Sequence, residues 1–268
     1  MTIKHLVTTG CSFSTPGKWP HYLDSRLENI QVYNLGRDSA GNDWISKTAI
    51  YQSHKLLQSG VQPEEILIIV MWSGIDRKGL FISNNETNDY DKFISTDVDC
   101  PIHFLNQPVN TKASSNKTAG YILGSMSAYL GTEHAREHKT NWLSCFAMEE
   151  LAVESYEHFL RLQWFCKSYN IKLLNLTYGD ILHYPNSQFL DPEKTGPLTN
   201  EIYESVRHLY DMVDFDQWAF YGKTAGQFEY TLNNKLLFDA DGHHPSLSAN
   251  EHYVDNFLIP ILKEKALI

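Results

Sequence analysis

Apolar residues in the first third of the chain fall into short runs, and polar segments that contain glycine separate them. Residues 3–8 and 31–35 are predicted strands, and residues 65–72 form the clearest one. This last run is apolar almost without interruption, which is typical of a parallel strand covered on both faces. Helical periodicity over residues about 18–28 and 43–59 separates the three runs. Strands and helices that alternate at this spacing predict a doubly wound α/β sheet.

The pattern loosens after the third strand. A polar stretch rich in Asn, Ser, Thr and Asp follows, and it is longer than an ordinary loop. Helical patterns then cover residues about 118–138 and 144–169, and residues 171–176 form a further predicted strand. We therefore expect one domain over residues 1–268, with an inserted segment at about 79–145 that lies over the carboxyl edge of the sheet.

Two polar loops lie near the opposite ends of the chain. Leu236–Phe238 is a predicted strand that leads into the turn Asp241–Pro245, and residues about 199–210 and 248–265 are predicted helices. The first strand leads in the same way into a polar loop that contains Ser12. In α/β sheets such loops lie at the carboxyl edge of the strands, where sites are usually built. Both loops are therefore expected at one edge of the sheet.

Composition narrows the class of protein. The chain has 268 residues, 42% hydrophobic and 20% charged, which is ordinary for a globular protein. Its net charge of −10, without a basic run, argues against nucleic acid or an anionic membrane as partner. The N-terminus lacks the pattern of a signal peptide, and no apolar run reaches membrane-spanning length, so a cytoplasmic location is expected. No oligomeric state is predicted.

The cysteines and the aromatic residues lead to two further expectations. The spacing of the four cysteines is typical neither of a metal site nor of a disulfide framework, so reduced thiols are expected. Aromatic residues make up 13% of the chain, with 15 Tyr and 6 Trp. Most of them are expected to form a rich core. The alternative is that some line a groove for a sugar or another flat ligand.

Ser12 and the late turn carry the residue types of a nucleophilic site. A serine hydroxyl becomes an effective nucleophile when an imidazole takes its proton and a carboxylate orients that imidazole. Asp241 and His244 are three residues apart, so one tight turn can place the carboxylate on the imidazole. The alternatives are an ordinary N-cap role for Ser12, His243 as the imidazole and Asp239 as the carboxylate.

These two segments resemble motifs of the SGNH (GDSL-like) hydrolases. Gly10–Ser14 reads Gly-Cys-Ser-Phe-Ser, similar to the family's Gly-Asp-Ser-x-Ser block, and Asp241–Pro245 reads Asp-Gly-His-His-Pro, similar to its Asp-x-x-His-Pro block. The Gly-x-Ser-x-Gly elbow of the α/β-hydrolases is not found. The resemblance implies a three-layer α/β/α sandwich with a central, mostly parallel, five-stranded sheet of the flavodoxin-like type.

The resemblance also implies an activity, that of a serine esterase or related acyl hydrolase. Ser12 would be the nucleophile, His244 the general base and Asp241 the residue that orients it, with no cofactor and no metal. The partner would be a small-molecule ester or an ester of a carbohydrate, and the aromatic content favours the carbohydrate.

The oxyanion donors follow from the same resemblance. The backbone N–H groups of Ser12 and of a glycine after the second strand would stabilise the negative charge. Gly36 and Gly41 both qualify, and Gly41, which Asn42 and Asp43 follow, matches the family block better. A turn glycine without this role is the alternative for each.

The third family block departs from the pattern. The family usually has Gly-x-Asn-Asp after the third strand, but here the strand runs into Trp72–Arg77, which contains no Asn. Ser73 and Asn84 are the candidates to replace that donor. Since loss of one oxyanion donor costs roughly 2.7–4 kcal/mol in the transition state, the alternative function is an SGNH-like binding or structural module with weak or no catalysis.

Two other chemistries are disfavoured. His134 and His138 are four residues apart beside Glu133 and Glu137, but the order differs from known zinc motifs and no third ligand is evident. A solvated helix face is the expectation there. The spacing from Gly10 to Lys18 is wrong for a Walker-type phosphate loop.

Overall fold

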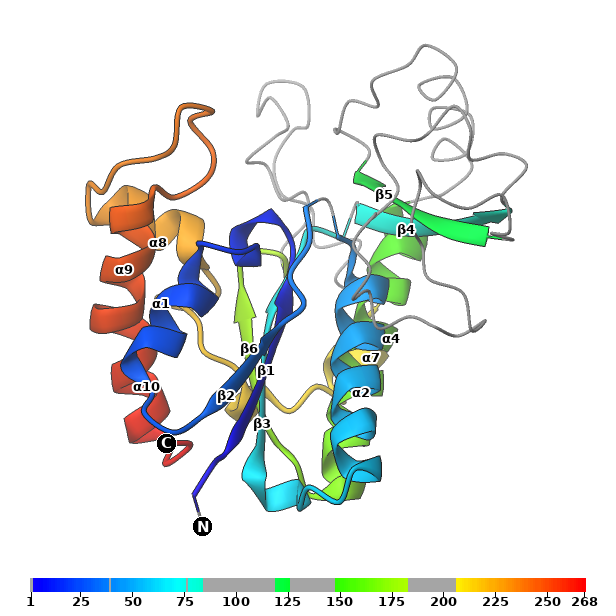
Figure 1. Ribbon diagram of the computed structural model, residues 1–268. Coiled ribbons are helices and arrows are strands. Elements are labelled where there is room, and N and C mark those ends of the chain that lie inside the picture. The colour runs from blue at the N-terminus through cyan, green and yellow to red at the C-terminus, as the bar shows by residue number, and fades with distance from the viewer. Residues whose placement is uncertain (1, 39, 76, 84–118, 126–147, 183–205) are drawn as a thin grey trace.

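A parallel sheet of four strands forms the centre of the protein. The computed structural model describes residues 2–38, 40–75, 77–83, 119–125, 148–182 and 206–268. The strands stand in the order β2 (Gln31–Asn34), β1 (His5–Gly10), β3 (Ile66–Trp72) and β6 (Lys172–Thr177), and they all run the same way (Figure 1). Their carboxyl ends therefore share one edge.

The sequence of β3 explains its central place. All seven of its residues are buried, and β1 pairs with it on one side and β6 on the other. Ile68, for example, lies opposite Val7 of β1 and Leu173 of β6. β-branched residues pack well on a pleated surface that is covered on both faces, so this strand forms the inside of the core.

Helices cover both faces of the sheet (Figure 1). On one side lie α1 (Trp19–Arg26), α8 (Gln227–Asn233), α9 (Leu247–Tyr253) and α10 (Ile259–Glu264). On the other side lie α2 (Asn42–Gln58), α4 (Met148–Tyr169) and α7 (Arg207–Tyr210). A π-helical turn, Val254–Leu258, joins α9 to α10, and short 3₁₀ turns cover Ser12–Ser14, Pro63–Glu65 and Phe215–Gln217. The fold is thus the expected α/β class with helices on both faces.

The fifth strand of the expected sheet is not among the described strands. Beyond β6, a single parallel bridge joins Asn175 to Trp218, and the N–H of Ala219 donates to the carbonyl of Asn175 at 2.9 Å. Leu236–Phe238, which was expected to be a strand, makes only one antiparallel bridge, between Phe238 and Pro245. That expectation was wrong: Leu237 is 72% exposed, and no strand in the described part of the chain pairs with this segment in a ladder.

The segment after β3 holds a second, antiparallel sheet. β4 (Arg77–Ser83) pairs with β5 (Ala119–Ser125). Figure 1 shows this pair beside the carboxyl end of the main sheet, above α2. The helix expected from residue 118 onward is therefore wrong where β5 stands. The rest of that helix, and residues 199–205 of the helix expected before α7, lie outside the described residues.

The large aromatic residues explain much of the unusual composition. Among the largest fully buried side chains are Trp19, Trp44, Trp72, Tyr178 and Tyr253. They pack in one hydrophobic cluster around the sheet, so the described aromatic residues mostly support the core interpretation.

No helix in the described part of the chain is both long and apolar enough to cross a membrane. The described thiols are buried, and burial raises the pKa of Cys166 to about 12.

Candidate active site

Ser12 stands just beyond the carboxyl end of β1. It begins the 3₁₀ turn Ser12–Ser14, which the N–H of Ser14 closes by donating to the carbonyl of Cys11 at 2.8 Å. The hydroxyl of Thr15 donates to the carbonyl of Ser12 at 3.1 Å. Ser12 is only 9% exposed. It does not begin an α-helix, because α1 starts seven residues later at Trp19; the serine is held by a tight turn instead.

The late turn is organised around the carboxylate of Asp241. One of its oxygens accepts the N–H groups of His243 at 2.8 Å and of His244 at 2.9 Å. Gly242 has φ +71, a left-handed conformation that glycine adopts without steric cost. These contacts bend the chain back so that the side chain of His244 lies beside the carboxylate three residues before it.

The structure brings Ser12, His244 and Asp241 into one hydrogen-bonded array. The imidazole Nδ1 bonds the second carboxylate oxygen of Asp241, and Nε2 lies 2.7 Å from the Ser12 hydroxyl oxygen. With Nδ1 protonated, Nε2 is the acceptor for the serine hydroxyl. The competing residues lie differently, since His243 is exposed and the carboxylate of Asp239 pairs with Lys18.

The charge on Asp241 is strongly favoured. Burial raises the pKa of this carboxyl, but the N–H groups of His244 and His243 and the imidazole of His244 lower it by more. The net result is a pKa far below the usual range of an aspartate. The carboxylate is therefore ionised at moderate pH, and it can accept a hydrogen bond from His244 Nδ1.

Aromatic rings line one side of the array. The ring of Phe13 lies 5.1 Å from that of His244 and 5.2 Å from that of Tyr178, measured between centroids. The guanidinium of Arg77 lies 5.8 Å from the centroid of Tyr178, within range of a cation–π contact. Sequence reasoning missed Tyr178 and Arg77. The signal that points to Tyr178 is its position directly after a buried parallel strand, at the edge where Ser12 lies.

The two glycines that compete as oxyanion donors differ in their N–H groups. The N–H of Gly36 donates to the side-chain oxygen of Asn34 at 3.0 Å. For the N–H groups of Gly41 and Ser12, no acceptor is found among the described residues. A Cβ on Gly41 would lie 2.5 Å from the carbonyl oxygen of Arg77, so close an approach requires glycine. Of the two, Gly41 keeps the better-suited amide.

Asn42 joins the loops after β2 and β3. Its side-chain oxygen accepts the N–H of Ser73 at 2.9 Å, and its NH₂ group donates to the carbonyl of Ser73 at 3.1 Å and to the hydroxyl of Ser155 at 3.1 Å. Sequence reasoning named Asn42 only as a neighbour of Gly41. The Ser73 hydroxyl is buried without a hydrogen-bond partner in the described part of the chain.

The remaining candidate residues of the sequence stay predictions. Asn84, His134 and His138 lie outside the described residues. No group of three or more metal-ligating side chains occurs among the residues that are described.

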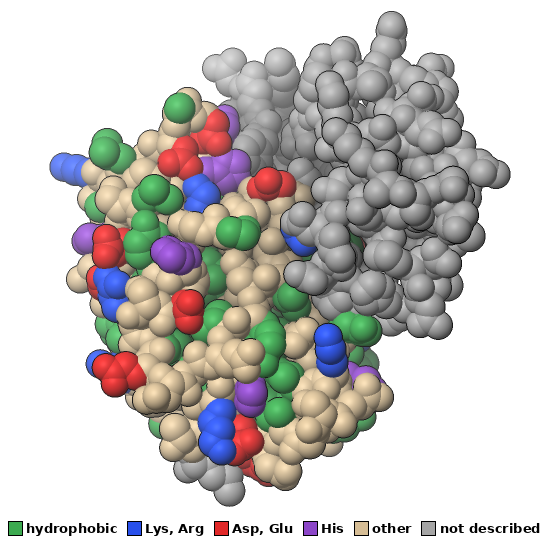
Figure 2. All heavy atoms as spheres, in the orientation of Figure 1, with side chains coloured by type: hydrophobic (Ala, Val, Ile, Leu, Met, Phe, Trp, Pro, Cys, Tyr) green, Lys and Arg blue, Asp and Glu red, His purple; other side chains and the backbone are tan. Residues whose placement is uncertain are grey.

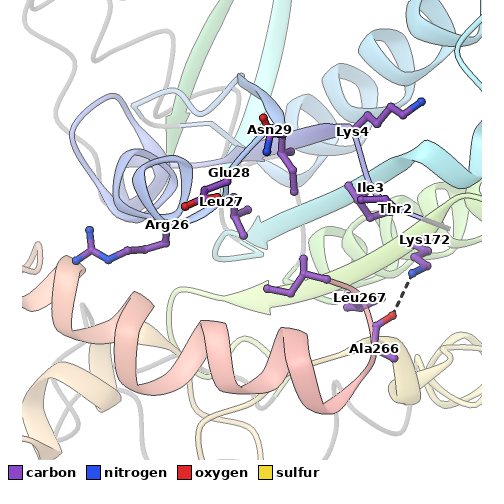
Figure 3. A pocket seen from close by; sticks show the side chains of 12 residues that line it. Thr2, Ile3, Lys4, Arg26, Leu27, Glu28, Asn29, Lys172, Ala266 and Leu267 are labelled. Carbon is purple, nitrogen blue, oxygen red and sulfur yellow. Dashed lines mark hydrogen bonds between the residues drawn. The ribbon is translucent and has the colours of Figure 1, made fainter.

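A groove of about 670 Å³ lies elsewhere, at the amino edge of the sheet (Figure 3). Its cations are already engaged: Lys172 donates to the carbonyl of Ala266 at 3.0 Å, Arg26 pairs with Asp255, and Lys4 pairs with Glu65. It holds none of the Ser12 array. At the other end of the described surface, acidic, histidine and basic side chains lie together (Figure 2). The candidate site is therefore identified by its hydrogen-bonded side chains and not by the volume of a groove.

Comparison with known proteins gives distant structural similarity only. No family model matches the sequence, and no curated protein matches it. Among solved structures, the chain is similar to a member of the lipolytic protein G-D-S-L family from Veillonella parvula DSM 2008. The identity is 12%, the match covers 98% of this chain and 96% of that chain, and the TM-score is 0.36.

Proposed function

We propose that this protein is a serine hydrolase that cleaves carboxylic esters. The observation that supports it is the array in which the Ser12 hydroxyl meets His244 Nε2 at 2.7 Å while Asp241 holds Nδ1. This combination of nucleophile, base and orienting carboxylate is recognised by geometry and recurs on unrelated folds. The motif resemblance agrees with it.

The proposed reaction has two stages. The Ser12 oxygen forms a bond to the ester carbonyl carbon while its proton passes to His244 Nε2. The tetrahedral intermediate collapses, the carbon–alkoxide bond breaks, and His244 gives the proton to the leaving alcohol. Water, deprotonated by the same imidazole, then attacks the acyl-enzyme, and Ser12 leaves with its proton restored. Asp241 orients His244 and stabilises the imidazolium throughout.

Three groups are proposed to stabilise the oxyanion. The N–H groups of Ser12 and Gly41 are suited to it because neither has an acceptor among the described residues. Ser73, buried at the end of β3 with its hydroxyl unpaired in the described structure, is the candidate for the third donor. Asn42 would then act indirectly, by fixing the Ser73 peptide beside the start of α2. Asn84 stays the alternative third donor.

The substrate is proposed to be a small-molecule ester. A carbohydrate ester stays within this proposal, but the packing of the described aromatic residues in the core removes part of its motivation. The proposal needs no cofactor, because every proton transfer is assigned to His244.

A second candidate is a binding or structural module with weak or no catalysis. Two observations favour it: Ser12 is only 9% exposed, and no Asn follows β3 in the described loop. In that case the array would be a structural hydrogen-bond network that orders the two loops.

The deciding experiment measures hydrolysis of p-nitrophenyl acetate and butyrate by wild type, Ser12→Ala and His244→Gln. The esterase proposal predicts saturable hydrolysis, with kcat/KM reduced at least about 10⁴-fold in each variant. His243→Gln is the matched control, since it removes the neighbouring exposed imidazole and keeps the backbone N–H that Asp241 accepts; it should retain wild-type activity. Labelling by a fluorophosphonate probe, followed by mass mapping to Ser12, covers a protein with a demanding natural substrate. If the wild type shows no hydrolysis and no labelling, the result would favour the binding or structural module.

A further inference from the structure

The turn that carries His244 needs an anchor outside the sheet. It belongs to no strand of the described sheets, and an isolated antiparallel bridge joins Phe238 to Pro245 across it. Within it, the N–H of Asp239 donates to the carbonyl of His244 at 2.7 Å. The side chain of Asp241 is 46% exposed. These bonds give the turn its shape, but they do not fix its position relative to Ser12.

Lys18 bonds to both arms of this turn, that is, to the chain before Asp241 and to the chain after His244. Its ammonium group pairs with the carboxylate of Asp239 on one arm and donates to the carbonyl of Pro245 at 3.3 Å on the other. The side chain of Lys18 is only 14% exposed, so its charge is screened less than that of a surface lysine. The ammonium therefore holds together the two arms between which Asp241 and His244 project.

The backbone of Lys18 is tied to the nucleophile loop. Its N–H donates to the carbonyl of Thr15 at 3.0 Å, and the hydroxyl of Thr15 donates to the carbonyl of Ser12 at 3.1 Å. One short path of hydrogen bonds thus runs from Ser12 through Thr15 and Lys18 to the turn of His244.

A second, uncharged path runs alongside. The indole N–H of Trp19 donates to the hydroxyl of Ser14 at 2.9 Å, and the backbone N–H of Trp19 donates to the side-chain oxygen of Asn250 at 3.0 Å. The NH₂ group of Asn250 donates to the carbonyl of Pro245 at 2.9 Å, the same oxygen that Lys18 contacts. Trp19 and Asn250 are fully buried, so substitutions in this path would destabilise the fold. Lys18 is partly exposed, and its side chain can be replaced with less loss of stability.

We infer that Lys18, through its ion pair with Asp239, is a positioning residue that holds the imidazole of His244 on the hydroxyl of Ser12. The inference rests on the proposed function for its effect on catalysis, but not for its effect on the Ser12–His244 hydrogen bond. Neither Lys18 nor Asp239 needs to touch the substrate. They set the separation between nucleophile and base, and a misplacement of about 1 Å in such a pair can cost about 10²-fold in rate.

The kinetic test uses Lys18→Met, which keeps much of the length of the side chain and removes the charge. We expect kcat to fall roughly 10- to 100-fold with little change in KM, and Lys18→Arg to restore most of the loss. Lys4→Met is the matched control, because it breaks the exposed Lys4–Glu65 ion pair at the amino edge of the sheet; its kcat should be unchanged. Wild-type kcat in folded Lys18→Met would overturn the inference.

The second measurement does not depend on activity. NMR of the ring protons gives the titration midpoint of His244 in wild type, Ser12→Ala, Lys18→Met and the double variant. Ser12→Ala should shift the midpoint in the wild-type background and shift it markedly less in the Lys18→Met background, a comparison that cancels the direct effect of the lysine charge. Equal shifts in both backgrounds, or no shift in wild type, would overturn the inference. If wild type hydrolyses no ester while the shifts differ as expected, the proposed function fails and the positioning role stands.

Discussion

The two halves of the candidate site are built in different ways. Ser12 follows β1, a strand paired on both sides and buried along nearly its whole length. His244 lies in a turn outside the sheet, beside a carboxylate that is 46% exposed. The serine half is thus set by the hydrophobic core, and the histidine half by a few polar contacts. Substitutions in the core should therefore change the stability of the protein, whereas substitutions near the turn should change the alignment of His244 with Ser12.

The largest expected effect comes from the core beneath the serine half. Ile68→Ala removes a fully buried side chain from the middle of β3, between β1 and β6. We expect the free energy of unfolding to fall by about 2–5 kcal/mol, measured by urea denaturation. At low temperature, the folded protein should keep the kcat of wild type, because the polar contacts around His244 remain. A selective loss of kcat without loss of stability would break the comparison.

A smaller effect is expected from the turn. Gly242→Ala places a side chain at φ +71, where no described atom beyond the two chain neighbours lies within 4 Å of the new Cβ, so the cost is conformational strain of about 1–2 kcal/mol. We expect kcat to fall several-fold as the turn relaxes away from Ser12. Gly60→Ala is the matched control: it has φ +93 and equally open surroundings, but lies just after α2. It should cost similar stability and leave kcat unchanged. Equal kcat in the two variants would contradict this prediction.

The smallest expected effect is the dependence of stability on pH through Asp241. Because its folded pKa is lowered, the carboxylate contributes stability that is fully present above its ordinary pKa of about 3.9 and is lost as the pH falls through the lower folded value. Asp241→Asn should therefore melt slightly below wild type at neutral pH, and the two melting curves should converge at strongly acidic pH. The side chain is nearly half exposed, so the difference is expected to be small. A difference that grows with acid would contradict the assignment.

Much of the fold could be predicted from the apolar pattern. β1, β2, β3 and β6, together with α1, α2 and α4, lie within a few residues of the expected ranges, because each buries a continuous run or a stripe. The pattern failed where apolar residues do not reach the core, as at Leu237. It also missed α8. The sequence signal for the start of this helix is Glu229, whose carboxylate accepts the N–H of Gly226, three residues earlier, at 2.8 Å.

The site was predictable only in part. Ser12, Asp241 and His244 were named because their motifs are local in sequence, and the structure brings them together. Their catalytic roles stay a prediction until activity is measured. Lys18 and Asn42 were not assigned these contacts. The partner of Lys18 lies 221 positions away in sequence, and the partners of Asn42 lie 31 and 113 positions away. No local pattern encodes such pairings; they appear only when the loops after β1, β2 and β3 and the turn that carries His244 meet at one edge.

The bond between Ser12 and His244 joins residues 232 positions apart. Closing so long a loop is entropically unfavourable until most of the intervening chain has folded. Formation of this contact should therefore be among the last events when the protein refolds. Reactivity of Ser12 would then report completed folding more strictly than helix content does, and a chain split in the segment between β4 and β5 would regain that reactivity only when its two pieces reassociate.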